Sequence, residues 1–452
     1  MDQWAGVVLA AGDGVRMRSR LTKVLHRVCG KELVRYPVDL MNQLGMSRVV
    51  VVVSPANHEA VEDLLGDQVE YVTQPAVTGT GDALGRTKEL LMGRAEHVLV
   101  LTADAPLVRW ESVKPLMAAH VDSSRDMTFL TCESGSAQDF GRVVRDEKGQ
   151  VVKIVEAADE TSTNNELAEV NGSVYCFRDG WLWQSVERIG AAPNGEKYIT
   201  SLVQIGSSGG STVQAIPTKD PAELMGVNDR LQLSQVEAVL RQRIREQWML
   251  SGVTMLDPAS VYIDAEVKIG QDTVILPNTS IVGRSVIGEE CEIGPNSVIR
   301  DSELGRGCRA TASVLEESTM EDGANIGPFS HLRPGAYLET GVHIGNFVEV
   351  KESRFAAGAV MGHFGYVGDA AIGAGANLGA GMVTCNYDGK DKHRTDIGER
   401  AFIGCDTMLV APVTVGAGAI TGAGSVVTKD VPAGRLAVGV PAKIRTSSPK
   451  TN

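Results

Sequence analysis

Residues 263–299 read IDAEVKIGQDTVILPNTSIVGRSVIGEECEIGPNSVI, with isoleucine at every sixth position from Ile263 to Ile299. Small residues stand four positions after five of these isoleucines: Thr273, Thr279, Ser285, Cys291 and Ser297. Neither a helix nor a hairpin has a period of six, whereas a triangular coil with one short strand on each side does. The spacing therefore predicts a parallel β-helix with a continuous interior ladder of aliphatic side chains.

The six-residue spacing returns further along the chain with interruptions. It restarts over 326–350, returns at Ile372 and Leu378, and runs again from Ile397 to Val415. We expect the repeat to be broken over 328–366, and we expect the polar stretch 384–396 to be a loop ejected from the coil. Because a repeat often binds its ligands on the face that tolerates insertions, both stretches are candidate binding regions.

The sequence before the repeat alternates short apolar strands with polar, helical stretches. Strands are predicted at 7–9, 49–53 and 98–101, and helices at about 33–44, 60–65 and 83–92. Buried strands separated by helices are typical of a mainly parallel, doubly wound sheet. Apolar residues at helical spacing over 229–250 predict one more helix, which is either a connector or the last helix of the first domain. We expect a Rossmann-like domain over 1–228, a helical linker over 229–250 and the β-helix over 251–452.

The composition of the chain limits the classes of binding partner and the cellular compartment that we expect for the protein. The 452-residue chain has a net charge of −13 at pH 7 and no long basic run, so nucleic acid and anionic membranes are poor partners. Its N-terminus lacks the pattern of a signal peptide, and no apolar run reaches 18 residues. Seven cysteines, without a zinc-like CxxC pair, fit reduced thiols. We expect a cytoplasmic protein that binds small molecules.

A glycine-rich turn follows the first predicted strand. Residues 9–17 read LAAGDGVRM, and Lys23 stands six positions later. The turn is not a Walker loop and lacks the third glycine of the dinucleotide fingerprint. Backbone N–H groups of such a turn can cradle phosphates, and Arg16 and Lys23 can neutralise them. Taken alone, a turn of this kind is structural about as often as it is functional.

The turn and the motifs after it resemble the signature of sugar-1-phosphate nucleotidyltransferases. The matching residues, in chain order, are Gln74, Gly79-Thr80-Gly81, Asp104, Gly141-Arg142, Glu156, Asn171 and Gly226-Val227-Asn228. The resemblance implies that Leu9, Ala10, Ala11, Gly12, Arg16 and Lys23 hold the nucleotide phosphates. It implies that Gln74, Gly79 and Thr80 read the pyrimidine base, that Gly141, Glu156 and Asn171 bind the sugar, and that Asp104 and Asn228 hold Mg²⁺. A divalent metal ion suits this reaction, because it lowers the repulsion between two negatively charged substrates and stabilises the charge that develops on the phosphoryl oxygens. The structural alternative for Asp104 is a turn or helix cap, since Ala105-Pro106 follows.

Motifs of the second half resemble the acetyltransferase half of the bifunctional N-acetylglucosamine-1-phosphate uridyltransferase/glucosamine-1-phosphate acetyltransferase family. They are Arg333-Pro334-Gly335, residues 345–351, Gly362-His363, residues 366–369, Asn377 and residues 385–389. The resemblance covers the chain except its last dozen or so residues. It implies that the β-helix is left-handed, that the protein is a homotrimer with sites completed across subunits, and that UTP and acetyl-CoA are co-substrates.

The same resemblance implies roles for single residues of the β-helix. His363 would be the general base for the attack of an amine on the acetyl-CoA thioester, with Glu349 as its orienting partner; a neutral imidazole near pH 7 suits this task. The structural alternative for His363 is a corner histidine bonded to a neighbouring coil. Cys405 could suggest a thiol nucleophile, but direct transfer needs none, so packing or a coenzyme contact is the expected role. The implied ligands of the amino-sugar phosphate are Arg333, Lys351, Tyr366, Asn377 and Lys392. Those of coenzyme A are Ala380, Asn386, Tyr387, Cys405 and Ala423.

The implied function has two steps in cell-envelope precursor synthesis. Glucosamine-1-phosphate is acetylated, and the product is joined to UTP with Mg²⁺ to give UDP-N-acetylglucosamine and pyrophosphate. The alternatives are a nucleotidyltransferase with a purely structural β-helix, and a regulatory subunit with both sites degenerate.

The sequence departs from the family pattern at three places. Thr102-Ala103 and Gly172-Ser173 differ from it near the expected sugar pocket, so the first domain could accept a different sugar. No arginine follows Gly439, where the family places one for coenzyme A, so Lys443 and Arg445 are substitutes to consider.

Overall fold

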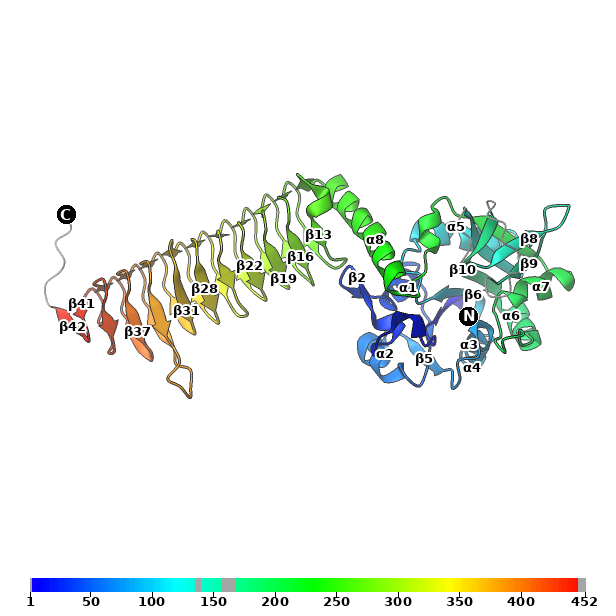
Figure 1. Ribbon diagram of the computed structural model, residues 1–452, viewed down its shortest axis with the longest axis horizontal. Helices are drawn as coiled ribbons and strands as arrows, with labels where there is room; N and C mark the ends of the chain where they lie inside the picture. Colours follow the sequence, from blue (N-terminus) through cyan, green and yellow to red (C-terminus); the bar gives the residue numbers. More distant parts are fainter. Residues whose placement is uncertain (1, 135–139, 157–167, 446–452) are drawn as a thin grey trace. The chain divides into compact units, whose positions relative to one another are not determined.

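The computed structural model describes residues 2–134, 140–156 and 168–445 (Figure 1). The chain forms two compact units, Met1–Leu240 and Arg241–Asn452. Helix α8 (Arg230–Leu250) includes the boundary between them. Within the described ranges, no helix combines the length and the apolar character needed to cross a membrane.

The first unit is built on a nine-stranded sheet whose main path runs β11-β7-β10-β6-β1-β4-β5. Strand β10 is antiparallel to both of its neighbours, and the other pairs on this path are parallel. The predicted mainly parallel sheet is therefore confirmed, with β10 as the one reversed strand on this path. The bounds are β1 (Asp2–Leu9), β4 (Val49–Val53), β5 (Glu70–Thr73), β6 (Ala95–Thr102), β7 (Met127–Ser134), β10 (Ala168–Arg178) and β11 (Val213–Pro217), with the hairpin β8 (Arg142–Arg145) and β9 (Val151–Val155) beside β10.

Helices cover both faces of this sheet. Alternate residues of β1 enter two separate cores, Val8 on one face and Val7 on the other. Helices α1, α2 and α5 pack into the first core and α3, α4, α6 and α7 into the second, which is the doubly wound arrangement. The bounds are α1 (Arg35–Gln43), α2 (His58–Leu65), α3 (Thr80–Arg86), α4 (Lys88–Leu91), α5 (Trp110–Asp122), α6 (Asp179–Ser185) and α7 (Ser201–Ser208).

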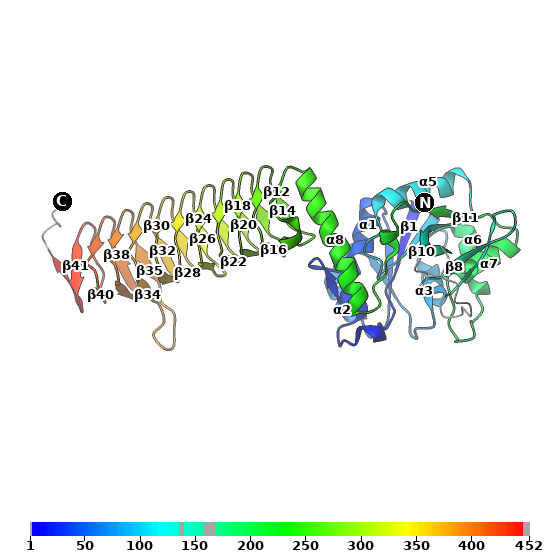
Figure 2. The same ribbon diagram turned by 45° about the horizontal axis from the view of Figure 1, so that its top comes forward.

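The second unit is a left-handed parallel β-helix, as predicted (Figures 1 and 2). Its three faces are sheets of twelve, ten and nine strands, which we call faces A, B and C. Residues one coil apart pair in register, for example Ile263 with Ile281 and Ile281 with Ile299. The faces begin with β12 (Thr254–Met255), β13 (Tyr262–Ile263) and β14 (Lys268–Ile269), and they end with β42 (Ala442–Arg445), β40 (Val426–Val427) and β38 (Val413–Val415).

The small residues of the repeat have a clear physical role. Thr273, Ser285 and Ser297 are fully buried, so their hydroxyl groups need partners inside the coil. Each donates a hydrogen bond to a backbone carbonyl oxygen: Gly288 at 2.8 Å, Val282 at 2.8 Å and Ala310 at 3.1 Å, respectively. A short hydroxyl side chain thus satisfies backbone groups at the corner where a larger side chain would not fit.

The interior ladder continues where the six-residue spacing is lost. Between Ile299 and Ile326 the inward, buried residues are Leu304, Ala310, Leu315 and Met320; between Val350 and Ile372 they are Phe355, Met361 and Val367. Some sides of the coil are five residues long in these stretches. The inward side chains therefore lose the spacing of six but still point to the axis of the coil. The expected break over 328–366 is therefore a change of spacing after Val350, and the coil itself continues through it.

The predicted loop after Thr384 does leave the coil. It is flanked by β34 (Val383–Cys385) and β35 (Thr395–Ile397), and it projects from the stack in both ribbon views (Figures 1 and 2). Tyr387 and Lys392 form an isolated antiparallel bridge inside it. The loop is thus a short hairpin attached where face B ends.

Candidate active sites

A cavity of about 410 Å³ opens in the first unit beyond the carboxyl ends of β1 and β6. Every residue predicted to bind nucleotide, sugar or metal in this unit lines it. These are Leu9, Ala10, Ala11, Gly12, Arg16, Lys23, Gln74, Gly79, Thr80, Asp104, Gly141, Glu156, Asn171 and Asn228. Leu9, Gln74 and Asp104 stand at or just after the carboxyl ends of the parallel strands β1, β5 and β6, which meet at one edge of the sheet.

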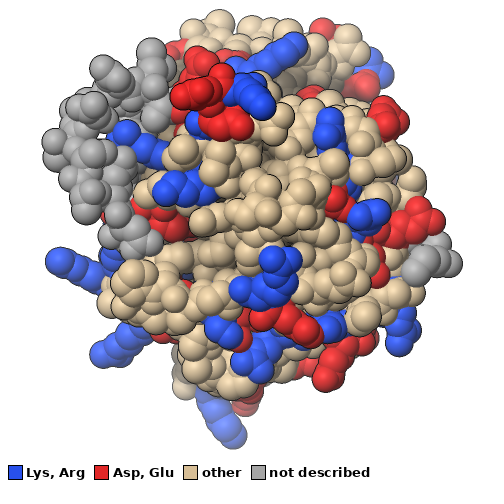
Figure 3. All heavy atoms as spheres, turned by 90° about the vertical axis from the view of Figure 1, so that its right-hand side faces the viewer, with Lys and Arg blue, Asp and Glu red and all other residues tan. Residues whose placement is uncertain are grey.

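The glycine-rich turn leaves β1 in a fixed direction. The Ala10 N–H donates to Val52 O at 2.9 Å, and buried Asn57 donates to Ala10 O at 2.9 Å. Beyond this anchor the backbone turns at Gly14, with φ of +62°, and the Arg16 side chain is exposed. On the face of the first unit in Figure 3, basic and acidic side chains are mixed rather than arranged in a basic stripe. Among the residues predicted to bind phosphate, Arg16 and Lys23 are the two cations that line the cavity.

The Gly79-Thr80 segment packs against a segment that sequence reasoning missed. Gly79 has φ of +106°, and a Cβ there would lie 2.5 Å from Lys197 O. The Gly81 N–H donates to the same oxygen at 2.7 Å, and the Ile199 N–H donates to Thr80 Oγ1 at 3.0 Å. Buried Gln74 donates to Gly79 O at 3.1 Å. The backbone around Lys197 thus shapes the predicted base-reading loop.

The missed segment also lines the cavity with its own side chains, Glu196, Tyr198, Ile199 and Thr200. Its only sequence signal is a polar stretch before the apolar helix α7, and such a stretch reads as a helix start. The Thr200 hydroxyl donates to Glu156, so one of the missed residues orients a predicted sugar ligand.

Asp104 and Asn228 lie together around a cation. Lys23 Nζ is 2.5 Å from Asp104 Oδ2 and 3.3 Å from Asn228 Oδ1, and the Val227 N–H donates to Asp104 O at 2.8 Å. Burial acts to raise the pKa of Asp104, but the Lys23 ammonium group and hydrogen bonds from Lys23 and Thr102 outweigh it, so the pKa is lowered overall. The carboxyl group is therefore held as the anion.

This oxygen pair fits Mg²⁺. No group of three or more His, Cys, Asp or Glu suited to a metal occurs among the residues that the structure describes. Mg²⁺ does not need one, because it is commonly held by one or two protein oxygens together with substrate phosphates and water. The carboxylate of Asp104 and the amide oxygen of Asn228 already share one cation, the Lys23 ammonium group.

A β-bulge in β10 presents Asn171 to the cavity. The pairing of β10 with β7 shifts between Asn171 and Tyr175, and Ser173 has φ of +54°. Asn171 Nδ2 donates to Tyr175 Oη at 2.7 Å, which orients the amide. A Cβ at Gly172 would lie 2.7 Å from Leu224 Cδ2 and 2.9 Å from Leu130 O, which accounts for glycine there. Bulges of this kind re-aim side chains next to binding sites.

The second unit places His363 at the head of a row of small side chains. His363, Ala380, Cys405 and Ala423 each follow a glycine that ends a face A strand, in successive coils. The strands are β30 (Val360–Met361), β33 (Asn377–Leu378), β36 (Phe402–Ile403) and β39 (Ile420–Thr421). We call this line, where face A meets face B, the His363 row. His363 and Cys405 are exposed, and the small side chains leave room for an extended ligand along the row.

Cationic side chains gather at the opposite edge of face B. Arg333 Nη1 donates to Glu349 Oε1 at 2.7 Å, and Glu349 is paired in register with Tyr366 of β31 (Gly365–Gly368). The ammonium groups of Lys351 and Lys392 are neighbours, and the direct side-chain contact with Lys392, followed by desolvation and by the charge of Lys392, lowers the pKa of Lys351. Two adjacent ammonium groups repel each other, and a negative group bound between them would offset this repulsion. The pair therefore favours a bound anion.

One chain does not bring all the predicted acetyltransferase residues together. Asn377 lies on face A, whereas Arg333, Lys351 and Tyr366 lie on face B or at its end. Asn386 and Tyr387 stand at the base of the loop, across face B from Ala380. In the described part of the chain His363 forms no hydrogen bond, and its expected partner Glu349 binds Arg333 instead.

Comparison with known proteins matches both units. A MobA-like NTP transferase domain matches residues 6–197, and a bacterial transferase hexapeptide model of six repeats matches 266–301 and 394–429. The bifunctional protein GlmU of Shouchella clausii is 43% identical over 433 residues, which cover 96% of this chain and 95% of that protein. The chain belongs to the bifunctional GlmU family. GlmU of an Exiguobacterium species is 44% identical over 441 residues (97% of each chain), and GlmU of Caldanaerobacter subterraneus 43% over 439 (97% and 95%).

Membership of the GlmU family confirms the resemblance drawn from the sequence motifs. Alignments of this length include both the cavity of the first unit and the His363 row of the second. The protein is therefore a multifunctional transferase with a nucleotidyltransferase domain and a hexapeptide-repeat acyltransferase domain.

Proposed function

We propose that the chain catalyses two successive reactions in the synthesis of UDP-N-acetylglucosamine. The second unit acetylates the amine of glucosamine-1-phosphate with acetyl-CoA. The first unit transfers the uridylyl group of UTP to the resulting N-acetylglucosamine-1-phosphate and releases pyrophosphate. The observation that carries the proposal is that every predicted nucleotide, sugar and metal residue lines a single cavity. The product would supply peptidoglycan and lipopolysaccharide-type envelope precursors in the cytoplasm.

In the uridylyl transfer a phosphate oxygen of the sugar attacks the α-phosphate of UTP in line. No protein nucleophile is required, so the residues of the cavity act by binding and by neutralising charge. Arg16 and Lys23 offset the charge of the nucleotide, and the peptide groups of the turn donate hydrogen bonds to its phosphates. Asp104 and Asn228 would hold Mg²⁺, which would stabilise negative charge on the phosphoryl oxygens.

In the acetyl transfer the amine of the sugar attacks the thioester carbonyl. His363 accepts the proton that the amine loses as the C–N bond forms, and coenzyme A leaves as the C–S bond breaks. Arg333, Lys351 and Lys392 bind the sugar phosphate. The His363 row gives the extended arm of coenzyme A a path along small side chains that ends at the base.

The protein is proposed to act as a homotrimer, because the acetyltransferase residues of one chain are divided between two faces. A neighbouring copy would bring Asn377 of one subunit toward the cations of another. Beside the His363 row stand three exposed aromatic side chains, Phe329, Phe347 and Phe364, at 62%, 59% and 54% exposure. The Phe329 and Phe347 rings stack with centroids 5.5 Å apart, and both residues have positive φ, which is rare for bulky residues. An apolar surface of this kind suits a subunit contact.

Replacing Phe347 with aspartate is expected to break the trimer and, with it, acetyl transfer. Aspartate tolerates the positive φ at this position, so the change removes the apolar contact without adding backbone strain. Sedimentation velocity should show monomers, with uridylyl transfer retained. Leu256→Asp, at an equally exposed apolar residue of the first coil, is the control and should remain trimeric. A trimeric Phe347→Asp protein with full acetyl transfer would contradict the proposed contact.

One assay panel tests the two-step function. The protein is supplied with glucosamine-1-phosphate, acetyl-CoA, UTP and Mg²⁺, and free thiol and pyrophosphate are measured separately. We expect both products, and we expect pyrophosphate alone when N-acetylglucosamine-1-phosphate replaces the first two substrates. Absence of acetyl-CoA turnover would leave the β-helix a structural module. Substituting other sugar-1-phosphates tests whether the bulge at Gly172-Ser173 changes the sugar that is accepted.

Gly79→Ala is expected to weaken UTP binding and to lower kcat/KM for uridylyl transfer about tenfold or more. Its Cβ would collide with Lys197 O at a backbone angle that alanine disfavours, and strain of this kind costs about 1–3 kcal/mol. Isothermal titration with UTP measures the effect. Gly93→Ala is the matched control, because Gly93 also has positive φ but nothing lies within 4 Å of a Cβ there. Equal affinities of the two variants would show that the contact with Lys197 does not shape the base site.

A further inference from the structure

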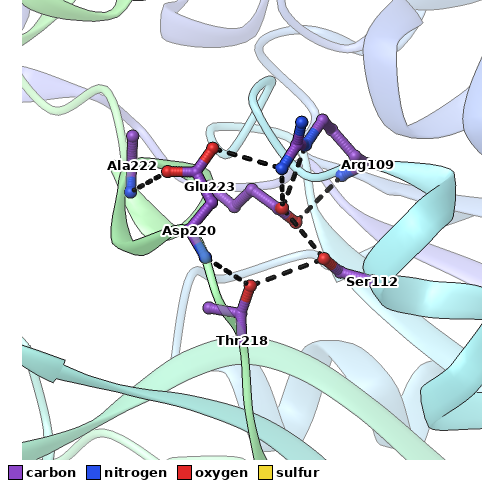
Figure 4. A network of polar contacts seen from close by, with 6 residues as sticks. All are labelled: Arg109, Ser112, Thr218, Asp220, Ala222 and Glu223. Carbon is purple, nitrogen blue, oxygen red and sulfur yellow. Dashed lines mark hydrogen bonds and ion pairs between the residues drawn. The ribbon is translucent and has the colours of Figure 1, made fainter.

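A fully buried carboxylate, Glu223, joins the two loops that carry Asp104 and Asn228 (Figure 4). Arg109 donates to Glu223 Oε1 from Nε at 3.0 Å and from Nη2 at 2.9 Å, and its backbone N–H lies 3.3 Å from Oε2. The Ser112 hydroxyl donates to Oε1 at 2.8 Å. Arg109 also contacts Asp220 at 3.2 Å. These donors, from Arg109 and Ser112, all lie at the start of α5.

The contacts between Glu223 and the start of α5 link two segments that lie next to Asp104 and Asn228 in the sequence. Arg109 and Ser112 follow Asp104 across a short loop, and Glu223 precedes Asn228 by another short segment. The Val227 N–H donates to Asp104 O at 2.8 Å, so the two loops are joined once beside the metal pair. The Glu223 contacts join them a second time. Two separate contacts fix the orientation of one loop relative to the other, whereas a single contact would allow the loops to rotate about it.

Burying Glu223 has a free-energy cost, and this cost makes the Arg109–Glu223 contact favourable only for one relative position of the two loops. A buried carboxylate loses its hydration, and only well-placed donors offset that loss. An apolar pair of similar volume would often stabilise a fold equally well or better. Because the donors are all on one loop and the carboxylate on the other, the loss is offset only when the loops keep this register.

We infer that Glu223 is a positioning residue for uridylyl transfer, setting the distance and orientation of Asp104 relative to Asn228 through the Arg109–Glu223 contact. Glu223 does not line the cavity, so it acts through these two residues and not on the substrate. The inference rests on the proposed function and on the assignment of Mg²⁺ to Asp104 and Asn228. Residues that orient metal ligands commonly change metal affinity about 10- to 100-fold when replaced.

The test compares Glu223→Gln with a matched buried carboxylate elsewhere in the first unit. Asp126 is also buried, and it also accepts hydrogen bonds from an arginine, Arg178, and from a hydroxyl and a backbone N–H, both of Thr212. It precedes β7, at the end of the sheet opposite to the cavity. Asp126→Asn therefore removes a similar buried charge without touching either loop.

Glu223→Gln is expected to raise the Mg²⁺ concentration for half-maximal pyrophosphate release about tenfold or more. Mn²⁺ binding in the presence of UTP, measured by electron paramagnetic resonance without turnover, should weaken by a similar factor. Acetyl transfer by the other unit should be unchanged. Asp126→Asn should lower thermal stability and leave both metal measurements at wild-type values.

Two results would overturn the inference: wild-type metal dependence in Glu223→Gln, or an equal shift in Asp126→Asn. If Glu223→Gln does not fold, Ser112→Ala replaces it and removes one of the same hydrogen bonds. Ser112→Ala should shift metal dependence in the same direction by a smaller factor, and no shift would also overturn the inference. A wild-type protein without Mg²⁺-dependent pyrophosphate release would instead refute the proposed function, which separates the two failures.

Discussion

His363→Ala is expected to lower the rate of acetyl transfer by about 10²- to 10⁴-fold and to leave uridylyl transfer unchanged. The imidazole is exposed, forms no hydrogen bond within the described part of the chain and heads the His363 row. Its removal therefore costs the protein a base without disturbing the interior of the coil. Thiol release from acetyl-CoA measures the first reaction, and pyrophosphate release from UTP measures the second in the same sample.

His343→Ala is the control for this variant. His343 also lies on the β-helix surface, but its Nδ1 is paired with Asn325, and it lies outside the His363 row. We expect near wild-type acetyl transfer from it. A His363→Ala protein that acetylates glucosamine-1-phosphate normally would refute the assignment of the general base.

The exposed thiol of Cys405 gives a second way to examine the mechanism. A covalent acetyl-cysteine route would need this thiol, because Cys405 lies on the same row as His363. Direct transfer does not need it, so Cys405→Ser should acetylate at a rate close to that of the wild type. Comparing the two variants distinguishes proton removal by His363 from thiol catalysis.

The β-helix could be predicted from sequence because its interior repeats a simple requirement. Each side of a coil must direct one side chain to the axis, and the isoleucines from Ile263 to Ile299 show this at constant spacing. The requirement remains when a side shortens to five residues, but the spacing changes. Leu304, Ala310, Leu315 and Met320 therefore continue the ladder without showing the period. Sequence spacing detects only the regular coils.

The cavity of the first unit was predictable only in part, for a different reason. Leu9, Gln74 and Asp104 belong to motifs that a resemblance identifies, and the parallel strands β1, β5 and β6 bring them together. The segment around Lys197 shapes the Gly79-Thr80 loop through its backbone and lines the cavity with four side chains, but these residues belong to no motif that a resemblance identifies. Glu223 stands in a polar stretch and would be read as a surface residue, yet the fold buries it completely. Contacts between distant loops of this kind have no local sequence signal.

Asp104→Ala is expected to reduce uridylyl transfer by roughly a thousandfold or more, with acetyl transfer unaffected. The carboxylate is the only charged member of the predicted metal pair, and a metal contributes several kcal/mol of charge stabilisation, of which about 4 kcal/mol corresponds to a thousandfold in rate. Its loss also frees the Lys23 ammonium group, which is 2.5 Å from Asp104 Oδ2 in the present arrangement. Lys23 would then be free to compete with the metal for the phosphates.

Pyrophosphate release at several Mg²⁺ concentrations measures this effect, and chelation of Mg²⁺ from the wild type should give the same loss while acetyl transfer continues. Asp13→Ala is the control, because Asp13 is an exposed carboxylate of the same glycine-rich turn and does not line the cavity. A thousandfold loss in Asp104→Ala beside normal activity in Asp13→Ala would place the metal at the end of β6. If Asp104→Ala instead keeps its rate and its Mg²⁺ dependence, the ion pair with Lys23 is structural, and the metal must bind through phosphates and Asn228 alone.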